Sequence, residues 1–270
     1  MRIATWNVNG IRARQAQLAE WMQRDRPEVV CLQELKAESA QIPEPCKLED
    51  YWGYWHCLRG YSGVSLQIRK DLLEREPVFS HPDFDMESRI VQVDYGNVVL
   101  ASVYVPNGGK DFPAKMSFLE RLLGWTRRLH DEGRELILCG DMNIARSEID
   151  VHPKERKPQS IGQRPDERAL FEELLGDNLI DVGRALDPDN ENLFTWWAPW
   201  RNMRARNIGW RLDYVLASKG LAARADSCTV LADVGTSDHA PVVVTLGSAQ
   251  ATGAFPPTGV STSSRRTAKG

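Results

Sequence analysis

The sequence predicts an α/β fold, with helices and strands spread along one domain. Short apolar runs of strand length recur between residues 2 and 246, and longer segments with apolar residues at helical spacing lie between them. No linker rich in Pro, Gly or Ser divides residues 1–247. The chain has 270 residues, 42% of them hydrophobic, so it can bury a sizeable core in one domain.

The first half of the chain opens with a predicted strand, helix and strand. Residues 2–6 form a short mixed strand, and apolar residues at helical spacing predict an amphipathic helix over residues 15–24. Pro27 ends that helix, because proline cannot continue a helical backbone. The apolar run at residues 29–32 predicts the second strand. Further strands are predicted at residues 63–68, 90–94 and 98–105.

The second half contains two longer helices and several short strands. A helix over residues 113–130 is predicted because Met116, Leu119 and Leu123 fall on one side of it. Residues 136–139 form an apolar run that predicts a strand, and residues 166–175 predict another helix. The remaining predicted strands are residues 195–197, 212–216 and 242–246.

Composition excludes some classes of protein and leaves others open. The N-terminus has no apolar run of signal length, and no stretch approaches the roughly 18 apolar residues of a membrane span. We therefore expect a cytoplasmic protein, monomeric and without a membrane partner. The five cysteines are odd in number and lack any Cys-x-x-Cys spacing, so we expect free thiols and no soft-metal site. A net charge of −3 does not exclude a nucleic-acid partner, because charge distribution matters more than the total.

Residues 248–270 differ from the rest of the chain. Ser, Thr, Gly, Ala and Pro dominate this segment, and its only charged residues are Arg265, Arg266 and Lys269. Such a composition cannot bury enough apolar surface to offset the entropy of ordering. The sequence therefore predicts a disordered basic tail after a single domain formed by residues 1–247.

Polar residues follow or begin six of the predicted strands. Any one of them is more often a strand cap or a surface turn than a functional residue, but their recurrence favours a shared site. If these strand ends meet at one edge, carboxylate and amide oxygens without thiolates suit Mg²⁺ or Mn²⁺. The residues are Asn7 and Asn9, Glu34, Tyr104 and Asn107, Asp141 and Asn143, Asp213, and the pair Asp238 and His239.

Seven sequence blocks resemble the signature blocks of the exonuclease III family of AP endonucleases. They occur in the family's order and span residues 1 to about 247. Single blocks also occur across the wider endonuclease/exonuclease/phosphatase superfamily, but seven in order are specific. The blocks are residues 6–12 (WNVNGIR), 32–36 (LQELK), 60–64 (GYSGV), 104–108 (YVPNG), 140–143 (GDMN), 209–214 (GWRLDY) and 237–241 (SDHAP).

The resemblance implies a fold and an activity. The fold is a four-layered α/β sandwich, with two mostly antiparallel sheets packed face to face and helices outside. The activity is Mg²⁺-dependent hydrolysis of the phosphodiester 5′ to an abasic site, for which Mn²⁺ can substitute as the metal. The resemblance also implies 3′ to 5′ exonuclease and 3′-end-cleaning activities, so the expected partner is duplex DNA with abasic sites or blocked 3′ ends.

Carried over by resemblance, the strand-end residues divide into metal ligands and catalytic groups. Glu34 is the expected metal anchor, with Asn7 and Asp238 near it. Asp141 is expected to orient and deprotonate the attacking water, and Asn143 to hold that water or a phosphate oxygen. His239 is expected to contact the phosphate, with Asp213 holding its imidazole; Tyr104 and Asn107 complete the phosphate clamp.

Tryptophans and arginines between residues 196 and 212 suggest a substrate-binding region. By resemblance, Trp196, Trp210 and Leu212 line the pocket that receives the flipped-out abasic sugar. Trp197 is expected in the core. Trp200 lies in a loop with arginines that include Arg204 and Arg206. This loop is either a solvated charged segment or one that enters a DNA groove and neutralises phosphates.

Three places depart from the family pattern. The loop at residues 108–112 is short, the stretch at residues 150–158 lacks the usual Asn- and Gly-containing pattern, and Ser88 stands where Gly is common. We expect all three places to contact DNA or to lie near it. They leave the chemistry intact and affect the balance between endonuclease and exonuclease activities.

Two other functions remain open from the sequence alone. A superfamily phosphatase or phosphodiesterase acting on inositol phosphates or sphingolipid could share Glu34, Asp141, Asn143 and the Asp238-His239 pair. The block at residues 209–214 and the tryptophan pocket argue against that reading. A non-catalytic binding protein is the second alternative, and the competent residue at every expected catalytic position argues against it.

Overall fold

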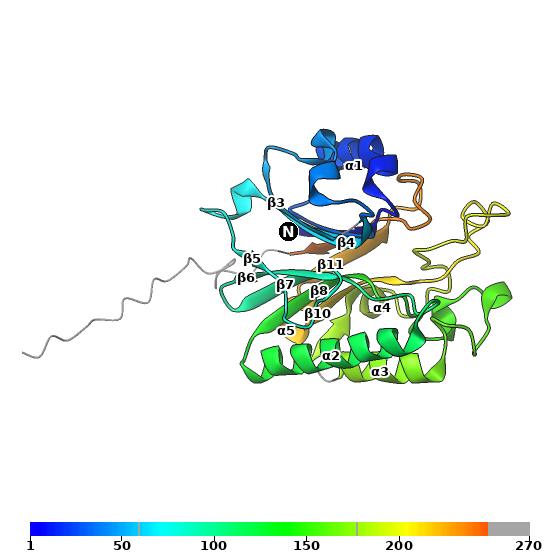
Figure 1. The fold of residues 1–270 in the computed structure, drawn as a ribbon. Helices are drawn as coiled ribbons and strands as arrows, with labels where there is room; N and C mark the ends of the chain where they lie inside the picture. The colour runs from blue at the N-terminus through cyan, green and yellow to red at the C-terminus, as the bar shows by residue number, and fades with distance from the viewer. Residues whose placement is uncertain (59, 177, 248–270) are drawn as a thin grey trace, which may run out of the picture.

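Two six-stranded sheets lie face to face in the computed structural model of the chain, with the longer helices on their outer sides (Figure 1). The structure describes residues 1–58, 60–176 and 178–247. The first sheet has the order β11-β12-β1-β2-β4-β3 and contains β1 (Arg2–Asn7), β2 (Val29–Gln33), β3 (Tyr51–Leu58), β4 (Tyr61–Arg69), β11 (Ala225–Val230) and β12 (Val242–Leu246). The second has the order β5-β6-β7-β8-β10-β9 and contains β5 (Phe79–Ser80), β6 (Ile90–Tyr95), β7 (Val98–Tyr104), β8 (Glu135–Asp141), β9 (Leu179–Asp181) and β10 (Asp213–Ser218).

Most neighbouring strands in both sheets are antiparallel. The exceptions are β1 with β2 in the first sheet and β7 with β8 in the second. Parallel neighbours end at the same edge of a sheet, so Asn7 lies beside Gln33 and Tyr104 lies beside Asp141. The architecture confirms the predicted four-layered α/β sandwich.

Three longer helices cover the outer faces. They are α1 (Ile11–Asp25), α2 (Phe112–Asp131) and α3 (Pro165–Leu175). In Figure 1, α1 lies on one side of the paired sheets and α2 and α3 on the other. The shorter helices are α4 (Val182–Leu186) and α5 (Lys219–Ala222), with 3₁₀ turns at Ser39–Gln41, Glu44–Cys46, Lys70–Leu72, Glu148–Asp150 and Pro153–Glu155. No helix in the described part of the chain is both long and apolar enough to cross a membrane.

The core consists of layers that follow the two-residue period of the strands. Along β1, Ile3 belongs to the cluster between the sheets, whereas Ala4 belongs to the cluster under α1. Along β8, Ile137 faces the layer between the sheets, and Leu136 and Leu138 pack with α2 and α3. Strands covered on both faces are apolar throughout, which is why the central strands appear as continuous apolar runs in the sequence.

The sequence prediction missed four of the observed strands, and one strand that it predicted does not form. The unpredicted strands β3, β5, β9 and β11 are the four edge strands of the two sheets. The predicted strand at residues 195–197 is wrong, because Trp196 makes only isolated bridges with Trp210 and His239. The predicted tail at residues 248–270 lies outside the described residues, so it stays a prediction.

Candidate active site

The polar residues predicted from the strand ends gather at one end of the sandwich. Asn7 ends β1, Tyr104 ends β7 and Asp141 ends β8. The antiparallel strands β10 and β12 begin at that same edge, because Asp213 pairs with Asp141 and residue 242 pairs with residue 5. Glu34 follows β2, and the Asp238-His239 pair precedes β12. Strand direction alone therefore brings these residues together.

A buried carboxylate and imidazole form the centre of this group. His239 Nδ1 donates a hydrogen bond to Asp213 Oδ2 at 2.8 Å, and His239 Nε2 lies 3.9 Å from Asp141 Oδ2. Thr195 Oγ1 also donates to Asp213 Oδ2 at 2.7 Å. The partner of His239 is thus Asp213, and not its chain neighbour Asp238. Each of the three titratable side chains is nearly or fully buried.

Asp141 is held by amide donors on two sides. Asn7 Nδ2 donates to Asp141 Oδ2 at 2.9 Å, and the backbone N–H of Asn143 donates to Oδ1 at 2.8 Å. Gly140 precedes Asp141 with φ 154°, where an added Cβ would come within 1.8 Å of the Val103 carbonyl oxygen. Only glycine fits there, so the close approach of β7 and β8 fixes the end of β8.

The surroundings of Asp141, His239 and Tyr104 shift the pKa of each of these groups. Burial raises the pKa of Asp141 to about 7, although the charge of His239 opposes that shift. Burial alone would lower the pKa of His239, but the carboxylates of Asp213 and Asp141 raise it to about 10. The imidazole is therefore a cation at neutral pH. Burial also raises the pKa of Tyr104, reinforced by Glu34, so its phenol keeps its proton.

The three predicted metal ligands are linked through Asn9 and Lys36. The Asn9 N–H donates to Asn7 Oδ1 at 2.9 Å. Lys36 Nζ lies 2.8 Å from Glu34 Oε1 and donates to Asn9 Oδ1 at 2.6 Å. Asn9 Nδ2 in turn donates to Asp238 Oδ1 at 2.7 Å. Both residues stand within the matched sequence blocks, and Asn9 is also one of the polar residues at the predicted strand ends.

The donor set fits a hard cation. Asn7, Glu34 and Asp238 offer amide and carboxylate oxygens, which Mg²⁺ and Mn²⁺ prefer. Ligand atoms of Asp141, Asp213 and His239 also lie within 4.8 Å of one another. That buried group suits a metal less well, because His239 Nδ1 is engaged by Asp213 and the ring is protonated at neutral pH. We therefore assign any metal to the oxygen set.

The predicted sugar pocket adjoins this group. Trp196 and Trp210 pack edge to face with ring centroids 5.6 Å apart, and Leu212 belongs to the same cluster. Trp196 Nε1 donates to Asp238 Oδ2 at 3.0 Å, which ties the apolar wall to a predicted metal ligand. Gly162 lies against the Trp210 ring. Trp197 is 1% exposed and belongs to the core.

The loop after Trp197 divides into exposed and packed residues. Trp200 is 59% exposed, and Arg206 is also exposed. Arg204 instead lies over the Trp197 ring and donates to the backbone carbonyls of Ala232, Val234 and Ser237. Arg204 therefore joins this loop to the one that carries Asp238.

Tyr104 and Asn107 occupy different environments. Tyr104 is buried, and the Arg89 guanidinium lies 5.0 Å from its ring centroid. Asn107 is exposed, and its Oδ1 accepts a hydrogen bond from the Gly109 N–H at 2.9 Å. Tyr104 is the last residue of β7, and Asn107 lies in the turn that follows it. Both residues therefore lie at the end of the sheets where a ligand would bind.

Two of the three departures from the family pattern include buried residues. Asp150 is fully buried and accepts from Arg211 and Arg184, and Ser88 is 4% exposed. Most of residues 152–158 are exposed, so the expectation that these places contact DNA or lie near it stays a prediction. Ser88 has φ 55°, a backbone region that favours glycine, which explains why Gly is common there.

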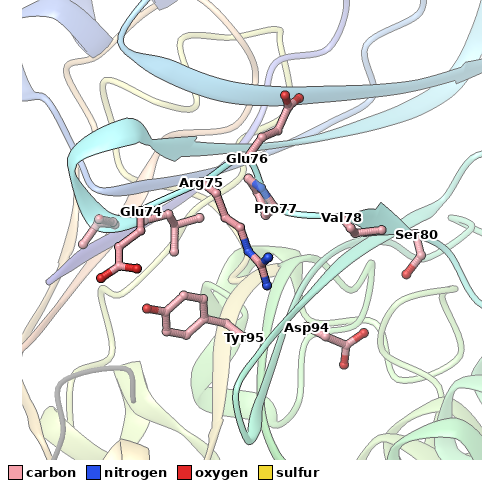
Figure 2. A pocket seen from close by; sticks show the side chains of 10 residues that line it. Glu74, Arg75, Glu76, Pro77, Val78, Ser80, Asp94 and Tyr95 are labelled. Carbon is pink, nitrogen blue, oxygen red and sulfur yellow. The ribbon is translucent and has the colours of Figure 1, made fainter. Parts of the chain in front are cut away.

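A sizeable cavity lies away from this group. It has a volume of about 540 Å³ and is lined by residues 72–78, Ser80, Asp94 and Tyr95 (Figure 2). Tyr95 pairs with Val98 at the start of β7, whereas Tyr104 ends β7. The cavity thus lies at the opposite end of the strands from the active-site group, and none of the predicted site residues lines it.

Comparisons with known proteins agree with this geometry. The profile of the Endonuclease/Exonuclease/phosphatase family matches residues 4–239. An exodeoxyribonuclease of Bacillus subtilis is 33% identical over 90% of this chain and 98% of its own length. An AP endonuclease from Archaeoglobus fulgidus superposes with a TM-score of 0.81 at 28% identity, covering 91% of this chain and 99% of that one. The 3′ phosphatase NExo from Neisseria, bound to a product DNA hairpin, gives a TM-score of 0.82 at 27% identity, covering 91% of this chain and 99% of that one.

The chain therefore belongs to the endonuclease/exonuclease/phosphatase family and, within it, to the exodeoxyribonuclease III branch that its sequence blocks resemble.

Proposed function

We propose that this protein is a DNA-repair nuclease that hydrolyses the phosphodiester 5′ to an abasic site in duplex DNA. The same site is proposed to remove nucleotides from 3′ ends and to clear blocked 3′ ends. The observation that carries this proposal is the buried group Asp141, Asp213 and His239 beside the walls formed by Trp196 and Trp210. The names of the relatives, an exodeoxyribonuclease, an AP endonuclease and a 3′ phosphatase, support the same chemistry.

Asp141 is the proposed base. Its raised pKa makes the carboxylate a stronger proton acceptor than an exposed aspartate. The amide groups of Asn7 and Asn143 fix the direction of its oxygens. Asp141 can therefore hold a water molecule and take its proton as the water attacks phosphorus, in line with the leaving 3′ oxygen.

His239 and Tyr104 are the proposed donors to the phosphate. Asp213 binds His239 Nδ1, so Nε2 is left to donate to a phosphoryl oxygen. The positive charge of this imidazolium stabilises the negative charge that develops in the transition state. Tyr104 keeps its proton, which lets its hydroxyl donate a second hydrogen bond, and Asn107 completes the clamp from the rim.

Asn7, Glu34 and Asp238 are the residues proposed to hold Mg²⁺, with Mn²⁺ as a substitute. When bound, such an ion supplies positive charge near the phosphoryl oxygens and the leaving group. Lys36 contacts Glu34, and Asn9 contacts Asp238, so these two residues set the positions of both carboxylates. Their role is to keep the oxygen donors together.

Substrate selection is proposed to come from the tryptophan pocket and the exposed loop. An apolar pocket of fixed size between Trp196, Trp210 and Leu212 admits a deoxyribose without a base and excludes a complete nucleotide. Trp200 and Arg206 are exposed on the neighbouring loop, where an aromatic ring and a cation suit contact with the DNA backbone. An arginine-dependent salt slope in DNA binding tests that part.

Product analysis on matched substrates tests the proposed function. Abasic duplex, 3′-phosphate duplex and blunt duplex are incubated with Mg²⁺, with Mn²⁺, and with EDTA. We expect a nick 5′ to the abasic site, loss of activity in EDTA, and rates at least 100-fold lower in folded Asp141→Asn and His239→Ala. Activity of either variant within tenfold of the parent would refute the assigned roles.

A small phosphoester substrate provides the contrast. Hydrolysis of an inositol phosphate without cleavage of abasic DNA would assign the protein to the phosphatases of the superfamily. Binding of DNA without hydrolysis of any substrate would support the non-catalytic reading. The expected monomeric state and cytoplasmic location stay predictions of the sequence, and light scattering of the purified protein checks the first.

A further inference from the structure

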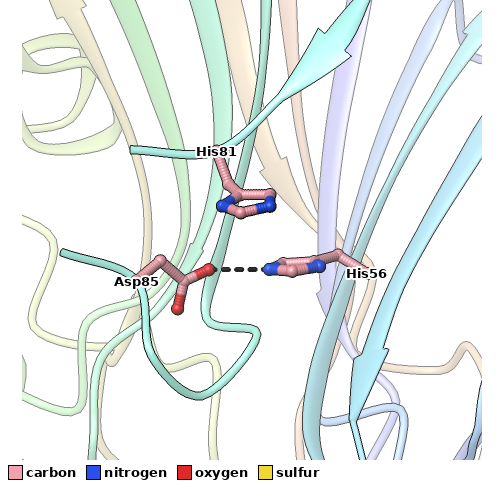
Figure 3. A group of neighbouring side chains, drawn as sticks. All are labelled: His56, His81 and Asp85. Atoms are coloured by element: carbon pink, nitrogen blue, oxygen red, sulfur yellow. Dashed lines mark hydrogen bonds and ion pairs between the residues drawn. The ribbon is translucent and has the colours of Figure 1, made fainter. Parts of the chain in front are cut away.

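Two imidazoles and a carboxylate meet outside the proposed active site (Figure 3). His56 belongs to edge strand β3 of the first sheet, whereas His81 and Asp85 belong to the segment between β5 and β6 of the second. The cluster therefore joins the edges of the two sheets. None of the three residues stands among those assigned to DNA hydrolysis.

The side chains of this cluster are close enough to share one ion. His56 Nε2 lies 2.9 Å from Asp85 Oδ2, and the rings of His56 and His81 stack with centroids 4.4 Å apart. One ligand atom from each residue lies within 4.8 Å of the other two. Ligands of a tetrahedral zinc ion stand about 3.3 Å apart, given bonds of about 2.0–2.1 Å. The two rings now lie nearly parallel, at an interplanar angle of 12°, so they must turn out of this stack for all three donors to reach that spacing.

Asp85 is fixed before any ion arrives. Its side chain is fully buried, and its oxygens accept hydrogen bonds from the backbone N–H groups of Arg89 and Ile90. Such outer contacts orient a ligating carboxylate. Burial alone would raise the pKa of Asp85, but His56 and these N–H groups lower it, so the group is a carboxylate at neutral pH.

Both histidines of the cluster can be reached from solvent. The His56 side chain is 15% exposed and His81 is exposed, so an ion can reach the cluster from solvent. An ion between His56 and Asp85 would replace the proton that now joins them. Binding would therefore release that proton.

We propose that His56, His81 and Asp85 form a binding site for a transition-metal ion of the Zn²⁺ type. Neutral imidazole nitrogen selects zinc and similar ions over Mg²⁺, which prefers oxygen donors. The site revises the sequence-based expectation of no soft-metal site, which considered cysteines only. It is independent of the proposed nuclease function.

Zinc binding to the purified full chain tests the site. Equilibrium dialysis with Zn²⁺ is performed in millimolar Mg²⁺ on the parent, on His81→Ala, and on the control His130→Ala, which removes a histidine of another region. We expect one zinc per chain in the parent and in the control, with affinity at least tenfold weaker in His81→Ala. Zinc should also raise the melting temperature of the parent and not that of His81→Ala.

A second variant separates this site from the oxygen donors of the proposed active site. Glu34→Gln should bind zinc as the parent does. Absence of zinc binding in the parent, unchanged affinity in His81→Ala, or loss of binding in Glu34→Gln would each overturn the proposal. A nuclease that fails its activity test but binds zinc through His81 would leave this inference standing.

Discussion

Thr195 connects the buried Asp213 carboxylate to the backbone where β10 begins. Its hydroxyl donates to Asp213 Oδ2 and accepts from the N–H groups of Leu212 and Asp213 at 3.0 and 3.1 Å. One oxygen thus satisfies two buried donors and fixes the carboxylate that holds His239. Thr195 is a positioning residue, since it reaches the proposed reaction only through Asp213.

Replacing Thr195 with Val should reduce kcat about tenfold and leave KM nearly unchanged. The isosteric change leaves two buried N–H groups unpaired, which costs about 1–3 kcal/mol of unfolding free energy. Steady-state kinetics on abasic duplex and urea denaturation measure both effects. Thr195→Ser keeps the hydroxyl and should restore kcat; equal rates for parent and Thr195→Val would contradict the positioning role.

Residues at strand ends were predictable, whereas their supports were not. Asp141, Asp213 and His239 follow or begin apolar runs, so strand direction places them at one edge. Thr195 lies in a segment that forms no strand, and its role depends on the bridge between Trp196 and Trp210. The sequence shows the charge of Arg204 but not the Trp197 ring that it covers. Local sequence does not encode such long-range contacts.

Helices α2 and α3 are joined by a buried ion pair between Lys115 and Glu167. Both side chains are fully buried, and Lys115 Nζ also donates to the backbone carbonyl of Asn143 at 2.8 Å. Glu167 Oε1 accepts from the N–H of Gly162, the residue that lies against Trp210. The ion pair therefore holds in place the two loops that carry Asn143 and Gly162.

Lys115→Met should destabilise the fold by about 3–5 kcal/mol, because it leaves the Glu167 charge buried without a partner. The double variant Lys115→Met/Glu167→Leu removes both charges and should recover most of that loss. If the pair positions Asn143, the double variant stays slow despite its recovered stability. Urea denaturation and kcat on abasic duplex give the two readouts. Full recovery of kcat in the double variant would show that the pair serves stability alone.

Central strands were predicted correctly, and three of the four edge strands were missed because they are short or polar. The fourth, β3, has eight residues but no regular alternation of buried and exposed side chains. β1, β2 and β8 are covered on both faces, so they form apolar runs. The edge strand β11 alternates between exposed and partly buried residues, and β5 and β9 have two and three residues. Edge strands are kept short or polar, which blunts pairing with other chains but also weakens their sequence signal.

At the scale of the whole molecule, periodicity indicated an α/β protein but did not distinguish two stacked sheets from other α/β arrangements. The order of the seven sequence blocks supplied that distinction. The proposed hydrolytic group lies where β1 and β8 end, whereas the cavity of about 540 Å³ lies where β6 ends and β7 begins. Asp150, the first residue of the stretch at residues 150–158, is buried and pairs with arginines distant in sequence, a contact that periodicity does not reveal.

That buried network ties distant segments together. Arg211 donates to Asp150 at 2.7 Å and to both oxygens of Asp181 at 2.8 and 2.7 Å, and Arg184 donates to Asp150 at 2.6 Å. It joins the turn at Glu148–Asp150, the end of β9 and the entrance to β10. Because Arg211 stands between Trp210 and Leu212, the network also fixes the predicted sugar pocket.

Stability should fall in acid as this network loses charge. Burial alone would raise the pKa of Asp150, but Arg211 and Arg184 lower it below the ordinary value of about 3.9. A lowered folded-state pKa gives stability that is fully present above the unfolded-state value, so the loss occurs as the pH drops from about 4 through the folded-state pKa. Asp150→Asn removes the charge at every pH. It should cost about 3–5 kcal/mol at pH 7, since the buried Arg211 and the partly buried Arg184 lose an anionic partner.

Urea denaturation of parent and variant between pH 3 and pH 7 measures this dependence. The difference in unfolding free energy should stay constant above about pH 5 and shrink below about pH 4, where the parent also loses the charge. Asp166→Asn is the matched control, because Asp166 forms an exposed pair with Arg164 and should change stability by less than about 1 kcal/mol. A difference between parent and Asp150→Asn that does not vary with pH would show that packing, and not charge, accounts for the contribution of Asp150.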